Sequence, residues 1–434
     1  MTPDPPDPTD PPDLPAPLDR VRQVLAAAHR TEWARVLAAT VRVTRDLDLA
    51  QECCQDAYAR ALQTWPASGI PASPGGWLTT VARNRAKDVL QRESRFRRVM
   101  PQLVVDDPVE DPAADPNGSP AEVPVDDRLA LIFICCHPTL SGDAQVALSL
   151  RLLCGLSTAE VASAFLVTES TMAARITRAK KKISGARIPF RVPSDRDLPE
   201  RVAVVLDVLH LVFSTGHTAP IGDQLVRNDL LDNAIGLTRQ LRELLPDQPE
   251  VAALLALMLL IDARRDSRLT PAGELVLLPD QDRSRWDRGK IDEGARLLAA
   301  ALAGSSPGTF AVQAAIAAVH AEAACWDDTD WAEIVGLYDL LRARWPSPVV
   351  ELNRAVAIGM RDGPQAGLDA LQPLLDESTI ATYSYLSAAR ADFLRRLHRW
   401  TEAADAYQEA LALTDNAVER SFLSGRLGQV RAHR

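Results

Sequence analysis

The sequence predicts an all-α protein with two small helical domains, the second a helix-turn-helix, and a long helical-repeat extension. Apolar residues recur at helical spacing along most of the chain, N-capping residues precede several of these segments, and proline-rich breaks separate them. At 434 residues, with 47% hydrophobic and 24% charged residues, the chain is expected to form several soluble domains. We expect the domains to cover 18–100 and 128–191, and the extension to cover 192–434.

The N-terminal segment combines an acidic arm with a helical domain. Residues 1–17 are rich in Pro and Asp, which predicts a disordered, extended arm without a secretory signal. Apolar periodicity then predicts four helices, over about 20–28, 31–43, 47–62 and 77–95. Asp46 or Asp48 can cap the third of these helices.

The third and fourth predicted helices have contrasting outer faces. The third has a polar face made of Gln51, Glu52, Gln55 and Asp56. The fourth has a strongly cationic surface that includes Asn84, Arg85 and Lys87. Each face has a plain alternative, since charged and polar helix faces usually contact only water.

Residues 156–183 predict two short helices joined by a tight turn. Ser157 and Glu160 form a capping box for the first helix, and Thr168 caps the second. The second helix should bury Met172, Ile176, Ala179 and Ile183. Its opposite face carries side chains that can reach bases and phosphates in a major groove: Ser170, Thr171, Arg175, Thr177, Arg178, Lys180, Lys181 and Lys182. The pattern is typical of a DNA-reading helix-turn-helix, and a solvated helical hairpin with a cationic end is the alternative.

Charge is distributed along the chain in blocks. The net charge of −10, taken alone, argues against nucleic-acid binding. Residues 20–100 carry a net charge of +7 and residues 128–191 carry +6, whereas 101–127 carries −8 and the chain after residue 191 carries −10. Nucleic-acid contact is therefore expected within the first 191 residues, with 101–127 as an acidic linker.

The sequence indicates neither an enzyme nor a metal or cofactor site. It contains no Walker loop, GxSxG or HExxH motif. Its six cysteines include no CxxC spacing. Cys135, Cys136 and His137 suggest a metal cluster, but the two thiols lie in an apolar helical run, where cysteines usually pack as small hydrophobes. The longest apolar run, 251–261, is too short to span a bilayer, so we expect a cytoplasmic protein without membrane contact.

The extension is expected to consist of repeated helix-loop-helix units. Near its end, the packing positions of a tetratricopeptide unit are occupied by Ala391, Leu394, Ala403, Tyr407 and Ala410. A short strand-like segment, GELVLL, interrupts the helices at 273–278. The charged residues around it predict either a buried ion network or a ligand site: Arg264, Arg265, Asp282, Arg283 and Asp287.

The order of these segments resembles that of a bacterial sigma factor. The chain contains, in sequence, AQECCQDAYARAL, GGWLTTVARNRAKDVLQRE, the acidic linker and LSTAEVASAFLVTESTMAARITRAKKKI. Over about 18–187 it is similar to the extracytoplasmic-function group of sigma-70 factors, which keeps two DNA-contacting domains. The helical-repeat tail resembles the subgroup in which a regulator is fused to the sigma factor.

This resemblance implies a role for each outer face. In the family, the helix matching 48–62 grips the β′ coiled coil of the RNA polymerase core, which implies core binding by Gln51, Glu52, Gln55 and Asp56. The matching basic helix contacts and melts the −10 promoter element, which implies DNA binding by Asn84, Arg85 and Lys87. The helix-turn-helix would read the −35 element, with the outer face of its second helix on bases and phosphates.

The implied function is an alternative sigma factor that directs promoter-specific initiation and carries a fused regulatory domain. The acidic extension would dock on the basic domains or recruit a protein partner. The alternative is a one-component helix-turn-helix regulator with a helical-repeat sensor domain, which binds operators without polymerase. That alternative gives no role to the polar third helix or the basic fourth helix.

Overall fold

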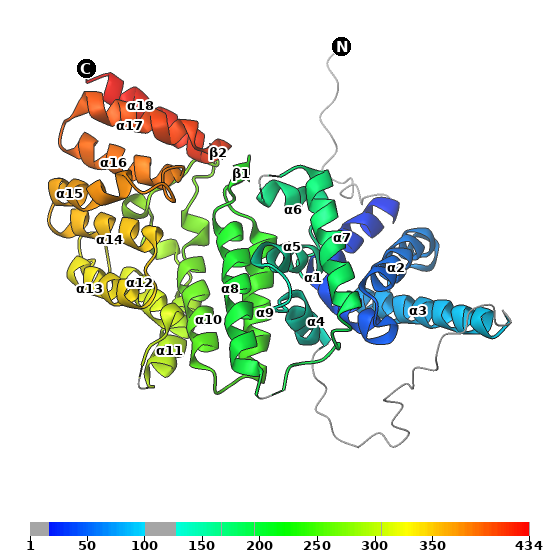
Figure 1. Cartoon of the computed structure of the whole chain (residues 1–434). Coiled ribbons are helices and arrows are strands. Elements are labelled where there is room, and N and C mark those ends of the chain that lie inside the picture. The colour runs from blue at the N-terminus through cyan, green and yellow to red at the C-terminus, as the bar shows by residue number, and fades with distance from the viewer. Residues whose placement is uncertain (1–16, 100–126, 166, 195, 305, 434) are drawn as a thin grey trace, which may run out of the picture. The chain divides into compact units, whose positions relative to one another are not determined.

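The described part of the chain is mainly α-helical, as the sequence predicts (Figure 1). The computed structural model describes residues 17–99, 127–165, 167–194, 196–304 and 306–433. Within these ranges one short parallel pairing occurs, between β1 (Ile221–Gly222) and β2 (Asp415–Asn416). The expected arm at 1–17 and linker at 101–127 lie outside the described residues, apart from Pro17 and Asp127, which each begin a helix.

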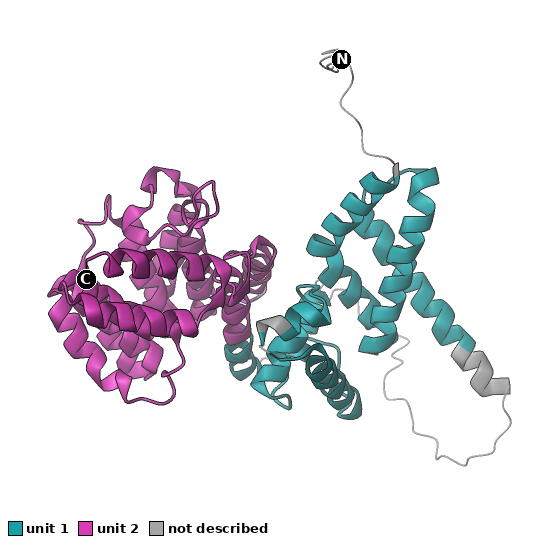
Figure 2. Ribbon diagram, turned by 90° about the horizontal axis from the view of Figure 1, so that it is seen from above, with its two compact units in different colours: residues 1–205 teal, residues 206–434 magenta. Residues whose placement is uncertain are grey.

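The chain divides into two compact units, residues 1–205 and 206–434 (Figure 2). The helices of the first unit are α1 (Pro17–Thr44), α2 (Leu47–Ser68), α3 (Pro74–Val99), α4 (Asp127–Cys135), α5 (Gly142–Leu152), α6 (Thr158–Ala164) and α7 (Glu169–Gly185). Helix α8 (Leu198–His217) begins in the first unit and continues into the second.

The N-terminal domain is a bundle of three helices, α1 to α3, instead of the four predicted. The expected break between 20–28 and 31–43 is wrong, because α1 continues through it. Thr31, the expected start of the second helix, donates its hydroxyl to the Ala27 carbonyl (3.1 Å), a bond made inside a helix. Trp33 and Leu37 are buried and continue the packing stripe of α1.

Local sequence signals set the ends of α2 and α3. Asp46 is the cap of α2, since its Oδ1 accepts from the backbone amides of Asp48 (2.8 Å) and Leu49 (2.9 Å). Helix α3 starts at Pro74, where the missing amide hydrogen of proline costs no intrahelical hydrogen bond. The loop between them therefore spans only 69–73, and the Trp65 and Trp77 rings flanking it meet edge to face at 5.3 Å.

The second unit is a succession of helices that pack on their neighbours. They are α9 (Asn228–Leu244), α10 (Pro249–Asp262), α11 (Arg288–Leu302), α12 (Thr309–Glu322), α13 (Trp331–Arg344), α14 (Pro348–Arg361), α15 (Pro364–Leu375), α16 (Ser384–Arg396), α17 (Trp400–Ala412) and α18 (Ala417–Arg431). The predicted strand at 273–278 is wrong, because its one bridge joins Leu269 to Leu275 and Leu278 begins a 3-10 turn.

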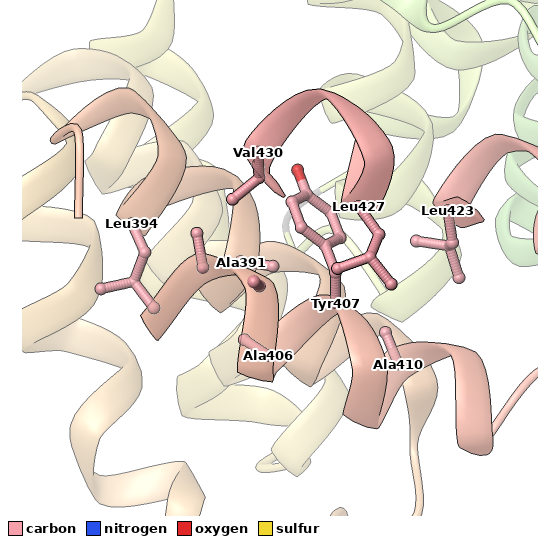
Figure 3. Close-up of a cluster of buried hydrophobic side chains, with 10 residues drawn as sticks. Ala391, Leu394, Ala406, Tyr407, Ala410, Leu423, Leu427 and Val430 are labelled. Carbon is pink, nitrogen blue, oxygen red and sulfur yellow. The ribbon is translucent and has the colours of Figure 1, made fainter. Parts of the chain in front are cut away.

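The last three helices enclose a cluster of small and large side chains (Figure 3). The five residues expected to pack in this segment, from Ala391 to Ala410, are all buried. Tyr407 of α17 lies between α16 and α18, where Leu427 and Val430 contribute the aliphatic side. Alanines at the α16–α17 contact let the two helix backbones approach closely.

A buried asparagine joins the two ends of the second unit. The Asn416 side chain donates to the carbonyls of Ala219 (2.9 Å) and Gln224 (3.0 Å), and its oxygen accepts from the Val418 amide (3.0 Å) at the start of α18. The nitrogen and the oxygen of the Asn416 side chain both have hydrogen-bond partners. These bonds connect the loop after α8 to the start of α18.

Candidate nucleic-acid interface

The helix-turn-helix has the local structure that its sequence predicts. The Ser157 amide donates to Glu160 Oε2 (2.7 Å), and the Glu160 amide donates to Ser157 Oγ (3.2 Å), which completes the capping box of α6. The Thr168 hydroxyl accepts from the Thr171 amide (3.3 Å) at the start of α7. The apolar stripe of α7 is buried at Met172, Ile176, Ala179 and Ile183. One face of α7 is thus fixed against the domain.

Most of the predicted DNA-reading side chains lie on the exposed face of α7. The exposed members are Ser170, Thr171, Thr177, Arg178, Lys181 and Lys182. Arg175 is different: its guanidinium pairs with Asp143 of α5 (3.2 Å) and lies over the Phe165 ring at 5.4 Å. Those contacts would have to break or rearrange before Arg175 could reach a base.

The cationic surface of α3 has two exposed candidates and one paired residue. Asn84 and Lys87 are exposed on the middle of the helix. Arg85 instead donates from Nε to Asp56 Oδ2 of α2 at 2.8 Å, and this hydrogen bond raises the pKa of its guanidinium. The fold therefore brings a predicted DNA-binding residue and a predicted core-binding residue into direct contact.

The polar face of α2 is partly covered by α7. Glu52, Gln55 and Asp56 are exposed, but Gln51 is only 7% exposed. Lys180 of α7 donates to the Gln51 side-chain oxygen and pairs with Asp48 Oδ1 at 2.9 Å. We call this the α2–α7 contact.

The α2–α7 contact joins two surfaces to which the sequence analysis gives different partners. A shallow hollow of about 310 Å³ lies along it, and its lining includes Glu52, Gln55 and Thr177 beside the contacting residues. Sequence reasoning did not find this contact, because its two sides are 129 residues apart and no local signal links them.

Five of the six cysteines are buried and pack as small apolar residues, and the sixth, Cys325, is exposed. Burial raises the pKa of Cys54 and of Cys136 to about 12, so both thiols stay protonated near neutral pH. His137 bonds to the Thr139 hydroxyl at 2.9 Å instead of joining its neighbouring thiols. Among the described residues, no group of three His, Cys, Asp or Glu side chains could hold a metal ion, and no helix is long and apolar enough to cross a membrane.

The two domains of the first unit match the two DNA-contacting regions of sigma factors. Residues 30–96, which include α2 and most of α3, match "Sigma-70 region 2". Residues 130–183, which end with α7, match "Sigma-70, region 4". The two matches support a sigma-70 family factor, a class of protein that binds the RNA polymerase core and promoter DNA.

The full chain also has a relative of nearly the same length. The uncharacterized protein R00370 of Rhizobium meliloti (strain 1021) is 41% identical to it over 398 residues, which is 92% of this chain and 94% of that protein. The two therefore belong to one family, and the likeness includes the extension. Residues 201–302 match DUF6596, a family of unknown function. No solved structure has a significant match to the chain.

Proposed function

We propose that this protein is an alternative sigma factor of the extracytoplasmic-function type, acting in the cytoplasm without catalytic activity or a cofactor. The observation that carries the proposal is the occurrence of regions 2 and 4 in one chain, each with its basic helix. In this proposal region 2 binds the β′ coiled coil and the −10 element, and region 4 binds the −35 element.

Core binding is assigned to the exposed part of the α2 face. Glu52 and Gln55 project from α2 beside the α2–α7 contact. A charge reversal tests the assignment: Glu52→Lys should weaken binding to purified core polymerase by about tenfold, or about 1.4 kcal/mol. Gln63→Lys is a matched control, because Gln63 is also exposed on α2. Equal core affinity for the two variants would refute the assignment.

DNA binding is assigned to the exposed faces of α3 and α7. Asn84 and Lys87 have the exposure needed to meet the promoter strand. On α7, Thr171, Thr177 and Arg178 are exposed candidates for base edges or adjacent phosphates. Replacing a phosphate-binding lysine should weaken all promoters alike, whereas replacing a base-reading residue should change the preferred −35 sequence.

We assign the extension a regulatory role and a tetratricopeptide-like architecture. Two observations support this proposal: its helices pack on their neighbours in sequence, and the C-terminal residues that the sequence assigns to tetratricopeptide packing positions are buried. A chain ending after Val205 tests the role while keeping Arg201, which lies over the Phe133 ring at 5.8 Å. Promoter-specific transcription by this truncated chain should differ from that of the full chain, and equal transcription would refute a regulatory role.

The one-component regulator is the rival proposal. It accounts for α6 and α7 and for the extension, but it leaves the region 2 match over 30–96 without a function. Binding to an operator duplex with full affinity and specificity in the absence of polymerase would favour the rival.

A further inference from the structure

The second unit contains a cavity that the proposed function does not use. Its volume is about 460 Å³, and it is lined by residues of α8, α10, α12, α13 and α14 together with the segment that follows α10. Much of its wall is aliphatic, with Leu257, Leu260, Ile316, Leu341 and Val350 facing the space. Such walls fit the apolar body of a small organic molecule.

A buried ion network lies beside this cavity, centred on a residue that sequence analysis overlooked. The Asp262 side chain is fully buried and pairs with Arg265 (2.7 Å) and Lys290 (2.8 Å). Arg265 also pairs with Asp232 (2.8 Å), and Lys290 with Asp287 (3.6 Å). The predicted ion network thus exists for Arg265 and Asp287.

The other charged residues of the predicted network have different partners. Asp282 caps the 3-10 turn that follows it, accepting from the Ser284 amide (2.9 Å). Arg283 lies over the Trp286 ring at 4.6 Å and donates to the carbonyls of His320 and Ala323. These contacts leave Arg264 outside the network.

Arg264 lines the cavity without an anionic partner. In the described parts of the chain no carboxylate forms an ion pair with its guanidinium, and burial together with the nearby Arg268 lowers its pKa to about 9. Arg268 is less available to bind an anion, because its guanidinium already donates to the His217 carbonyl and to the Thr218 hydroxyl (3.1 Å). Arg264 is partly buried, and a cation beside aliphatic walls without a counter-ion is unfavourable, so an anion in the cavity would lower this cost.

Three polar atoms on other cavity-lining residues are buried without a hydrogen-bond partner. They are Gln313 Nε2, His320 Nδ1 and Trp286 Nε1. Gln313 and His320 are seven residues apart, two turns of α12, and therefore share one face of that helix. Trp286 is only 4% exposed. Each buried polar atom left unpaired costs about 1–3 kcal/mol, and a bound polar group can recover part of this.

The histidines of the cavity add no positive charge. Burial lowers the pKa of His210 and of His320 to about 4, and it lowers the pKa of His217 as well. The cavity therefore offers one unpaired cation near neutral pH, which suits a monoanion better than a phosphate dianion.

We propose that this cavity binds a small organic carboxylate, with the carboxylate on Arg264, an accepting oxygen near Gln313, and an apolar body against α10, α12 and α14. The site belongs to the extension itself, so it does not depend on the proposed sigma activity. The resulting complex would stabilise the second unit by mass action.

Direct binding to the full chain tests this inference. The probes are 3-phenylpropionate and octanoate, with 3-phenylpropionamide as the neutral counterpart and inorganic phosphate as a second anion. Calorimetry should show saturable binding of at least one carboxylate, with the amide and phosphate at least about tenfold weaker. Thermal melting should show a matching rise in the Tm of the second unit.

Two variants distinguish a bound anion from a general effect on folding. Arg264→Gln should abolish carboxylate binding and should keep or raise the Tm of the free protein, because it removes a partly buried charge that has no counter-ion. Arg285→Gln removes a nearby exposed cation that does not line the cavity, and it should bind like the original chain. The inference is overturned if neither carboxylate binds saturably at about 10 mM, where a millimolar site would be mostly occupied. Equal binding of phosphate, or unchanged carboxylate binding by Arg264→Gln, also overturns it.

Discussion

Replacing Lys180 with alanine should strengthen binding to the RNA polymerase core. The Lys180 side chain is only 12% exposed, and its ammonium contacts both Asp48 and the buried Gln51. Because the Asp48 side chain is 71% exposed, its ion pair contributes no more than about 1 kcal/mol. Loss of the hydrogen bond to Gln51 contributes about 1 kcal/mol more. The α2–α7 contact should therefore weaken by about 2 kcal/mol, or roughly 30-fold in its equilibrium constant.

This change affects core binding because the contact covers part of the surface proposed for the core. If the closed arrangement predominates in the free protein, the apparent Kd for the core rises in inverse proportion to the open fraction. Lys180→Ala should then lower that Kd by up to about 30-fold, as measured by fluorescence anisotropy of labelled protein titrated with purified core. The same variant should bind promoter DNA more weakly, since it also removes a cation from α7.

Lys181→Ala provides the matched control for this measurement. Lys181 is an exposed cation on the same helix, and Lys180 is its partly buried neighbour. Lys181→Ala should weaken DNA binding while leaving core affinity unchanged. A core affinity that is equal or weaker in Lys180→Ala, compared with Lys181→Ala, would refute the reasoning. In the original chain, a zero-length amine–carboxylate cross-link between Lys180 and Asp48 should form and then disappear when core is added.

Two further predictions concern the stability of the second unit. Gly367→Ala should destabilise it by about 1–3 kcal/mol, because the new Cβ would lie 2.5 Å from the Phe393 ring. Gly336→Ala, in an open part of α13, should instead stabilise it by about 0.5–1 kcal/mol. Urea denaturation followed by tryptophan fluorescence measures the stability of both variants. Equal urea midpoints for the two variants would contradict the close packing of Gly367 against Phe393. Lowering the pH from 7 to 5 should also destabilise this unit, because unfolded histidine takes up a proton near pH 6.5 whereas His210 and His320 do so only at about 4. The loss should approach about 2 kcal/mol per histidine at pH 5, and an unchanged urea midpoint would contradict it.

The helix-turn-helix was predictable because its signals are local. A capping box spans three residues, and the threonine cap of α7 bonds to an amide three residues away. These contacts form in any chain with this sequence, before tertiary packing is considered. The continuity of α1 was missed because the local signal at Thr31 is ambiguous. A threonine can cap a new helix or donate its hydroxyl back inside a continuing one, and the packing of Trp33 favours the continuing helix.

The contacts between distant segments could not be predicted from local pattern. The polar stripe of α2 indicated a surface, but nothing in it showed that Lys180 would cover Gln51. The charged segment after α10 suggested an ion network or a ligand site, and the structure contains the network around Asp262 while leaving Arg264 unpaired. Which charges pair depends on the folding of α9, α10 and α11 together.

In the proposed function, this chain directs transcription initiation as a subunit of RNA polymerase. The most direct measurement is in vitro transcription with purified core polymerase, purified full-length protein and DNA fragments from the genome that encodes it. We expect run-off transcripts that start at defined sites and require both the protein and the core. Operator binding without polymerase, together with no transcript from any fragment, would contradict it.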